Sequence, residues 1–361
     1  GIDAAAQEQI VAAITSFAQY GFPESHAISF AIIAYASAYL KGHHPAVFYT
    51  TLLNAWPMGF YHPATLVKDA QRHGVRVRPV DVNASDWRCT IEPGDGPRPA
   101  ANGGAAADHA PPAGRRTTNT LRIGLRFVRG LSQASGEALV QARAAGPFRS
   151  IGELQRRCPE LSAAELTTLA EIGAFASLGE KPTRRDALWQ VSELVASRGG
   201  LLNETVDPRS PLPAMSLAER IQADYQGTSI TVGPHPMALC REALRARGVA
   251  TARELTALPD GRLVRAAGLI IVRQRPATAR GFFFMTLEDE SGLLNLIVAP
   301  PVFEQYRAVL LGASGLLVEG QLQRQHDSVS IKGLQFHDLA EALRGSAASG
   351  EPIAAPSRNF H

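Results

Sequence analysis

The chain has 361 residues, 45% of them hydrophobic, and a formal net charge of +3. At roughly 150 residues per domain, this length predicts two or three domains with proper cores. The small net charge excludes binding of nucleic acid through overall charge, so such a surface has to come from local clusters of basic residues. Three widely separated cysteines argue against a disulfide framework and against a zinc site, and they favour a reducing, cytoplasmic compartment. No apolar run is long enough to span a membrane, so no membrane contact is expected.

The basic side chains are almost all arginines. Lysine stands only at positions 41, 68, 181 and 332, whereas lysine and arginine together number 36. Arginine presents a planar fork that suits phosphate and a flat face that suits stacking on bases. This bias fits nucleic acid, although a GC-rich genome would produce it equally well.

A long helix is predicted near the N-terminus, within residues 17–45. Pro23 and Glu24 suit a first helical turn, and Gly42 followed by Pro45 supplies the stop. An apolar stripe on one side and a stripe of alanines on another predict a helix that is buried on nearly every side. The polar residues at its two ends are then candidates for ligand contact. They are Tyr20, Ser25, His26, Lys41 and His43.

A second helix is predicted from Pro63 to His73, followed by a short extended segment. Arg72 and His73 stand at the C-terminal end of this helix. They could reach a phosphate, or they could simply cap the last helix carbonyls, which is the commoner role for such residues.

These two segments resemble a known family. In the fingers region of bacterial replicative polymerases of the C family, a Y-G-F-x-x-S-H run opens such a helix and an L-K-x-H-x-P run closes it; this chain has YGFPESH and LKGHHP. The run from Met58 to Trp87 is similar to the error-prone branch of that family, the ImuC-type relatives of the DNA polymerase III alpha subunit. The similarity continues through LRIGLRFVRGLS, TVGPHPMAL and GFFFMTLEDESGLLNLIV to the final SRNFH. The resemblance implies a set of residues close to the nucleotide or the primer-template, namely Tyr20, Ser25, His26, Lys41 and Arg72.

A helix-hairpin-helix element is predicted after residue 120. The glycine turn Gly130-Leu131-Ser132 leads into a helix expected from Gln133 to Ala144. In such an element the unpaired backbone N–H groups at a helix N-terminus, together with the helix dipole, favour a phosphate. The contacts would be to the sugar-phosphate backbone and would carry no base specificity. The DNA-binding residues predicted here are Arg126, Arg129, Gly130, Leu131 and Ser132.

From Arg262 to Lys332 the pattern is typical of strands. Three strands, a helix and two further strands follow one another, which is the order of an OB-fold, a small barrel whose exposed face binds single strands. Arginines crowd the first turn and Phe282 and Phe284 share one face of the second strand, as in a platform where rings stack bases and arginines follow phosphates. Phe283 should point into the core, and one of the other two phenylalanines could equally be packed under the loop. The DNA-binding residues predicted here are Arg273, Arg275, Arg280, Phe282, Phe284 and Lys332.

Low-complexity stretches rich in glycine, proline and polar residues divide the chain. The predicted fold class is a multidomain α+β chain, with a helical fingers segment, a helix-hairpin-helix domain and then a five-stranded OB-fold barrel. The predicted boundaries are the C-terminal part of the fingers at 1–92, a disordered insertion at 93–119, the helix-hairpin-helix DNA-binding domain at 120–196, a linker at 197–213, a helical connector at 214–258, the OB-fold at 259–340 and a tail at 341–361.

The resemblance implies the C-terminal portion of an error-prone DNA-directed DNA polymerase, a nucleotidyltransferase that acts in damage-induced mutagenesis and translesion synthesis. Phosphoryl transfer needs carboxylates that hold two metal ions, and no D-x-D pair in a strand context occurs here. The acidic run of Glu288, Asp289 and Glu290 is expected to be a solvated turn. No catalytic residue, metal ligand or cofactor is therefore assigned within this chain. Mg²⁺ is expected at a catalytic palm domain ahead of Gly1, and the fragment alone should be inactive.

DNA is the expected partner, both as primer-template and as single strand. The linker lacks the glutamine and the aromatic residue of a sliding-clamp peptide, so the resemblance implies that an ImuB-like accessory protein makes the connection to the clamp. The alternative function is a non-catalytic single-stranded DNA-binding or scaffold protein that combines the helix-hairpin-helix and OB modules. A metal-dependent hydrolase built on His43 and His44 is rejected, because adjacent histidines on a helix point apart and no carboxylate accompanies them at metal spacing.

Overall fold

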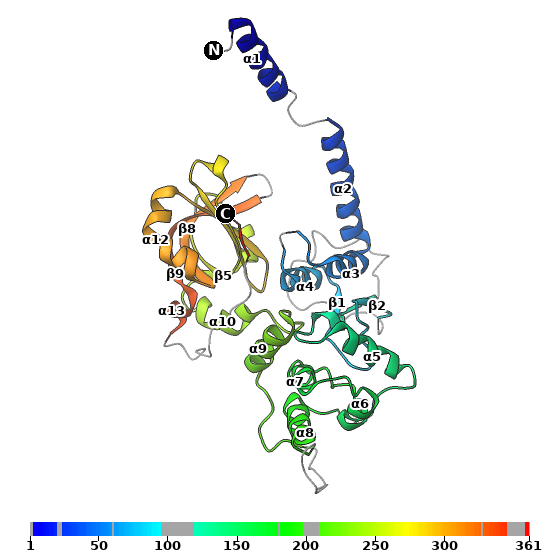
Figure 1. Cartoon of the computed structure of the whole chain (residues 1–361). Helices are drawn as coiled ribbons and strands as arrows, with labels where there is room; N and C mark the ends of the chain where they lie inside the picture. The colour runs from blue at the N-terminus through cyan, green and yellow to red at the C-terminus, as the bar shows by residue number, and fades with distance from the viewer. Residues whose placement is uncertain are drawn as a thin grey trace.

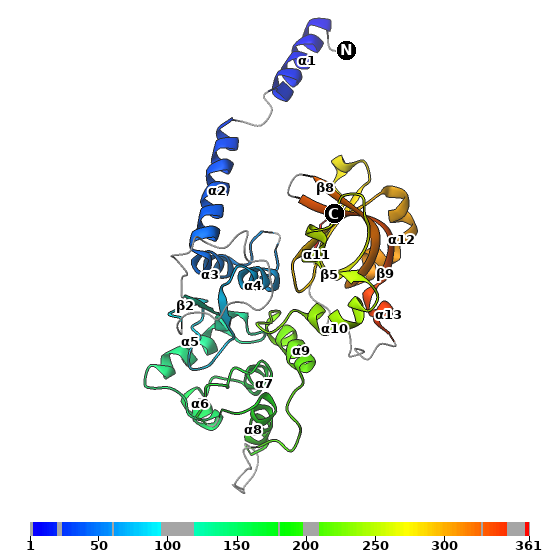
Figure 2. The ribbon, with the colours of Figure 1, turned by 180° about the vertical axis from the view of Figure 1, so that it is seen from behind.

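The computed structural model describes residues 3–19, 24–59, 61–94, 119–179, 181–197, 209–325, 328–344 and 358–360. The molecule consists of a helical arm, a helical body and a β-barrel that lies beside the body (Figure 1). The view from behind in Figure 2 shows the same arrangement, with α9 and α10 running from the body to the barrel. Across the described residues, no helix is both long and apolar enough to span a membrane.

The arm consists of α1 (Ala4–Gln19) and α2 (Glu24–His43), and it extends away from the rest of the molecule (Figure 1). The prediction that α2 is buried on nearly every side is wrong for this structure. Nearly all of its described side chains are exposed, and Ile32 and Tyr35 expose 63% and 75% of their surface. Periodicity identifies an apolar helix face, but it does not supply an element that covers that face.

The body packs short helices around a small sheet. Its helices are α3 (Pro45–Ala55), α4 (Pro63–Arg72), α5 (Gln133–Arg143), α6 (Ile151–Arg157), α7 (Ala163–Glu171) and α8 (Arg184–Ser197), with the 3₁₀ turn η1 (Leu125–Phe127) before α5. Its strands are β1 (Arg76–Arg78), β2 (Thr90–Glu92) and β3 (Thr120–Arg122). The central strand, β3, is parallel to β1 and antiparallel to β2. The segments before and after residues 95–118 therefore share one sheet, and one hydrophobic core extends from Ala46 to Ile230.

Serine residues set the starts of three helices in the body. Ser132, Ser150 and Ser162 each stand at the N-cap of α5, α6 or α7, and each side chain accepts a hydrogen bond from a backbone N–H in the first turn. Such a cap contributes about 1 kcal/mol to stability. The helix predicted at 133–144 is confirmed as α5, because this cap fixes its first residue.

Two further helices, α9 (Leu217–Thr228) and α10 (Pro236–Arg245), connect the body with the barrel. Helix α9 packs closely on α7, since a Cβ added at Gly227 would lie only 2.3 Å from Cγ2 of Ile172. Tyr225 on α9 is buried. The connection between the two parts of the molecule is thus itself packed against the body.

The barrel has the strand order of an OB-fold, as predicted. Its main elements are β5 (Leu263–Gln274), β6 (Phe283–Glu288), β7 (Leu293–Val298), α12 (Pro300–Gly312), β8 (Gly315–Gln325) and β9 (Ser328–Asp338). The smaller elements around them are β4 (Val249–Ala250), α11 (Ala252–Thr256), η2 (Ala277–Ala279), α13 (Leu339–Leu343) and β10 (Arg358–Phe360). Strands β5, β6 and β7 form an antiparallel meander, β7 pairs in parallel with β9, and β8 closes the barrel by pairing with both β9 and β5.

Alternation along the strands fills the barrel with apolar side chains and leaves polar ones outside. Phe283 is 4% exposed and its ring centroid lies 4.8 Å from that of Phe303 on α12, so the prediction that it enters the core is confirmed. Leu296 and Ile331 enter the same core from β7 and β9. Their sequence neighbours must therefore face outward.

Candidate nucleic-acid interface

Three neighbouring strands place one side chain each in a row on the outer face of the barrel. Phe284 of β6 stands opposite Ile297 of β7, and Ile297 stands opposite Lys332 of β9. Phe284 and Ile297 are half-buried, and Lys332 is exposed. An aromatic and an aliphatic surface next to one cation can stack a base and hold the adjoining phosphate. We call Phe284, Ile297 and Lys332 the platform row.

The loop between β5 and β6, residues 275–282, lies at the rim of this face. Arg280 is exposed and has a left-handed φ of 49°, and Phe282 is 37% exposed. The Arg275 side chain is 43% exposed, although its guanidinium lies 4.6 Å from the ring centroid of Phe303 and 3.8 Å from Oε1 of Glu304. We call residues 275–282 the open loop, because its charged side chains face solvent.

Arg273 has a structural role and not the DNA contact that the sequence predicted. Its side chain is buried, with the residue 4% exposed, and it donates to the backbone oxygens of Leu310 and Ala313 at the end of α12. Carbonyls at a helix C-terminus lack intrahelical donors, so the guanidinium satisfies them. Burial lowers the pKa of Arg273. No local pattern signals this role, because the two acceptors lie 37 and 40 residues downstream of Arg273.

The predicted hairpin of the body is present, but some of its backbone N–H groups already donate hydrogen bonds to other residues. Gly130 is exposed with a φ of +80°, which suits glycine, and Leu131 is buried. The backbone N–H of Ser132 donates to Oε1 of Glu165 (3.0 Å), and that of Arg129 donates to the Gly227 oxygen (2.7 Å). The N–H groups at the first two positions of α5 have no intrahelical acceptor by helix geometry. The N-terminal end of α5 therefore offers a phosphate fewer backbone N–H donors than the sequence predicted.

The two arginines beside the hairpin differ. Arg129 is exposed, and its Nη2 donates to Oγ of Ser229 at 2.9 Å. Arg126 instead donates to the backbone oxygens of Asn54 (2.7 Å) and Trp56 (2.6 Å). Arg126 thus ties α3 to the hairpin, which corrects the predicted DNA contact.

The predicted residues around α2 do not form one site. Tyr20 lies outside the described residues, as does the side chain of Ser25. His26 is exposed on the arm, and its ring packs edge-on against Phe30 at a centroid distance of 4.5 Å. Lys41, at the other end of α2, forms an ion pair of 2.8 Å with Asp69 of α4.

Asp69 is the centre of a polar cluster where α2 meets the body. It accepts a hydrogen bond of 2.6 Å from the Tyr49 hydroxyl, and its Oδ1 lies 3.3 Å from Nδ1 of His73. Burial alone would raise the pKa of Asp69, but the bonds to His73, Lys41 and Tyr49 hold it well below its usual range. Burial, reinforced by Asp69, raises the pKa of Tyr49. Lys41 is therefore a charge partner of α4 that retains 35% exposure of its side chain.

Arg72 is not free for a phosphate. Its Nη2 lies 2.7 Å from Oε1 of Glu288 on the barrel, and the two side chains are 16% and 4% exposed. Nε2 of His235 lies 3.9 Å from Oε2 of the same carboxylate. Burial raises the pKa of Glu288, opposed by Arg72, and burial lowers the pKa of His235 to about 3. Lys68 lies in the same cluster, and burial lowers its pKa to about 8.

The acidic run at 288–290 is thus not the solvated turn that the sequence predicted. Asp289 is fully buried, and its carboxylate accepts from the backbone N–H groups of Ala252, Ser291 and Gly292 at 2.7–2.9 Å. Glu290 pairs with Arg241 of α10. We call residues 288–292 the locked turn, because it fastens the barrel to α4, α10 and α11.

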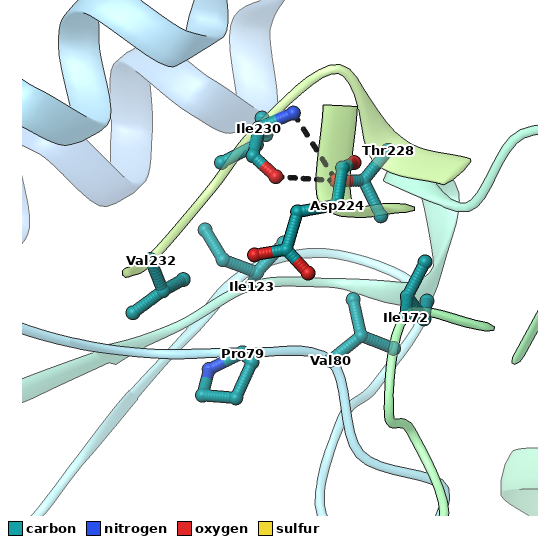
Figure 3. A pocket seen from close by; sticks show the side chains of 8 residues that line it. All are labelled: Pro79, Val80, Ile123, Ile172, Asp224, Thr228, Ile230 and Val232. Atoms are coloured by element: carbon teal, nitrogen blue, oxygen red, sulfur yellow. Dashed lines mark hydrogen bonds between the residues drawn. The ribbon is translucent and has the colours of Figure 1, made fainter. Parts of the chain in front are cut away.

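A hollow in the body is too small for a ligand (Figure 3). Asp224 borders it, and the Thr228 hydroxyl bridges the backbone of Ile230. The hollow has a volume of about 20 Å³, which is room for about one water. Asp224 pairs with Arg184 at 2.8 Å and accepts from the Thr231 hydroxyl at 2.7 Å. Burial raises the pKa of Asp224, although Arg184 and Thr231 oppose the shift.

Within the described ranges, no three His, Cys, Asp or Glu side chains gather as a metal ion would require. The nearest approach to an acidic cluster is the locked turn, whose carboxylates already bind Arg72, Arg241 and backbone N–H groups. In the part of the chain that the structure describes, these carboxylates are already bound to structural partners and do not fit a pair of catalytic magnesium ions.

Sequence reasoning missed Ile297, the middle member of the platform row. The signal was available, because GLLNLIVAP alternates and puts Leu293, Asn295 and Ile297 on one face. What the sequence could not supply is the register that sets Ile297 between Phe284 and Lys332.

Comparison with known proteins agrees with these features. Residues 74–187 match the family model of the helix-hairpin-helix motif. The chain is 48% identical over its full length to an error-prone DNA polymerase of Anaeromyxobacter sp. (strain K), and it covers 30% of that protein. It is 43% identical to the error-prone DNA polymerase of Burkholderia pseudomallei (strain K96243), with 98% of this chain and 31% of that protein aligned. The family resemblance is confirmed, and the chain spans about a third of the length of these relatives.

Proposed function

We propose that this chain, which is related along its whole length to a segment of the error-prone DNA polymerases, is the C-terminal part of such an enzyme and binds DNA for it. The parent reaction would be DNA-directed nucleotidyl transfer in damage-induced mutagenesis and translesion synthesis, in the cytoplasm. The segment would hold the primer-template through the body and the single-stranded template through the barrel. The observation that carries this proposal is the platform row, which offers stacking surface and one cation on three adjacent strands.

Catalysis would belong to the part of the parent protein that this chain does not match. The relatives are about three times as long as the aligned segment, so there is room for a palm domain with paired carboxylates that bind Mg²⁺. An ImuB-like accessory protein would connect the enzyme to the sliding clamp. These assignments rest on the family resemblance.

Binding of single strands by the whole chain tests the proposal. We expect a labelled oligonucleotide of about 16 nucleotides, the upper site size of an OB-fold, to bind with a steep salt dependence. Phe284→Ala should weaken binding about tenfold through lost stacking. Lys332→Ala should reduce the slope of log affinity against log salt by about 0.7, the value for one phosphate contact on a single strand.

Lys181→Ala is the matched control, because it removes an exposed lysine of the body, far along the chain from the platform row. It should leave both affinity and salt slope unchanged. Equal effects of Lys332→Ala and Lys181→Ala would contradict a platform on the barrel. A separate assay with primed DNA, nucleotides and Mg²⁺ should give no extension, and robust extension by this chain alone would refute the assignment of catalysis to another segment.

A further inference from the structure

A second hollow opens on the barrel where β7 and β9 begin and where α11 packs against them. It has a volume of about 230 Å³. This is many times the ~10–15 Å³ that one water needs, yet below the ~300–1,000 Å³ of sites that enclose a drug-sized ligand. The size suits one planar ring system and not a whole nucleotide.

The walls of this hollow are neutral. Asn295, Ser328, Ser330 and Thr256 contribute polar groups, and apolar walls come from residues such as Leu293. None of the described residues that line the hollow carries a charge. A phosphate would be desolvated there without a cation, whereas a base can bury its faces against aliphatic groups and bond its edge to amides and hydroxyls.

The Asn295 amide is already oriented. Its Oδ1 accepts a hydrogen bond of 3.2 Å from the Thr286 hydroxyl on β6. The NH₂ group is then the donor that the amide offers to a ligand, and it suits a ring nitrogen or a carbonyl oxygen on a base edge.

The hollow and the platform row lie at neighbouring positions along the same two strands, β7 and β9. Asn295 and Ser330 are register partners, and they lie two residues before Ile297 and Lys332 on the same strands. Two residues along a strand span about 6.6 Å. This is nearly twice the 3.4 Å per nucleotide of a stacked strand, so neighbouring rows match neighbouring nucleotides only if the strand is extended and unstacked.

We propose that this hollow is a base-receiving pocket, which takes one unstacked base of a single DNA strand while the adjoining nucleotide lies on the platform row. The proposal rests on the proposed function, since it requires that the barrel bind single strands. It adds a distinct site, because the platform row stacks a base through Phe284 and the pocket encloses another base through Asn295 and Ser330.

The test uses short oligonucleotides of about six nucleotides, which limits sliding and remains within the OB site size. Each nucleotide is replaced in turn by an abasic one, so that length and charge stay constant. With the unmodified chain, two positions should each lose affinity about tenfold when made abasic: a first because its base no longer stacks on Phe284, and a second because its base no longer fills the pocket. Ser330→Leu, which fills the pocket, should bind the intact strand about tenfold more weakly and should not distinguish it from the strand that is abasic at the second position.

Two controls separate the pocket from the platform row. Phe284→Ala should abolish the abasic effect at a different position, and Lys332→Ala should weaken binding of intact and abasic strands by the same factor. Asn295→Ala, which adds no side-chain volume, should reduce the difference in affinity between the intact strand and the abasic strand without changing thermal stability.

The pocket does not receive a base if Ser330→Leu still binds the intact strand about tenfold more tightly than the strand that is abasic at the pocket position. The same conclusion follows if no abasic position lowers the affinity of the unmodified chain. If the unmodified chain binds neither intact nor abasic strands, the proposed function fails and the pocket proposal fails with it. Binding with a normal salt slope, and with abasic discrimination only at the position whose effect Phe284→Ala abolishes, would overturn the pocket alone.

Discussion

The open loop and the locked turn stand at opposite ends of β6, and both carry charged residues. The open loop keeps Arg280 in solvent, whereas Glu288 and Asp289 of the locked turn are 3% and 0% exposed. The difference comes from distant elements. Helices α4, α10 and α11 bring cations and backbone donors to the locked turn, while α12 brings Glu304 to Arg275 of the open loop. A charged turn between strands therefore either faces solvent or anchors neighbouring elements, and the elements that pack against it decide which.

The largest effect should come from the locked turn. Asp289→Ala removes a buried carboxylate that accepts from three backbone N–H groups, and these donors would be left unpaired. We expect the free energy of unfolding of the barrel to fall by about 3–5 kcal/mol. Urea denaturation measures this change, and Glu304→Ala, whose side chain is 57% exposed, is the control that should stay within about 0.5 kcal/mol. Similar losses of unfolding free energy for both variants would mean that the locked turn does not anchor the barrel.

A smaller loss should distinguish the two arginines at the border of the open loop. Arg273→Met removes the charged donor from two carbonyls at the end of α12. It should lower the free energy of unfolding by about 2–3 kcal/mol. Arg275→Met changes a half-exposed side chain and should cost less than about 0.5 kcal/mol. Thermal unfolding of the two variants compares them directly. A reversed order would place Arg273 on the surface and Arg275 in the core.

Acid should weaken the contact between the locked turn and α10. His235 is held neutral with a pKa of about 3, whereas its ordinary value is 6.5. As the pH falls from about 6.5 to about 3, the unfolded chain takes up a proton that the folded chain refuses, so stability is lost. At pH 5 this amounts to about 2 kcal/mol.

The matched variant is His235→Asn, which keeps an N-cap acceptor for the Met237 N–H but does not titrate. Denaturation at pH 7 and pH 5 should show a smaller loss for this variant than for the unmodified chain. Equal losses in both proteins would exclude His235 as the source of the acid sensitivity.

The smallest effect belongs to the open loop itself. Arg280→Ala should leave stability unchanged and weaken single-strand binding only about threefold, because one exposed arginine makes at most one phosphate contact. Affinity measured at two salt concentrations checks this. An effect larger than that of Phe284→Ala would move the main binding surface from the platform row to the open loop.

The strands of the barrel and the capped helices of the body were predictable because they depend on local signals. Alternation marked β6 and β7, and Ser132 before a helical period marked α5. The assignment of roles to Arg72, Arg126 and Arg273 failed for a common reason. Each side chain bonds to a partner at least 37 residues away in the sequence. An arginine that points at phosphate and an arginine that satisfies buried carbonyls look the same in a sequence.

Sequence by itself determined the family, the helix-hairpin-helix element and the order of strands and helix that makes an OB-fold, because these follow from periods, turn residues and motifs read along the chain. Only the tertiary structure decided that α2 stands exposed, that the acidic run at 288–290 is buried, and that Ile297 joins Phe284 and Lys332 in one row. Burial and register depend on which distant segments meet, and that is a property of the packed molecule.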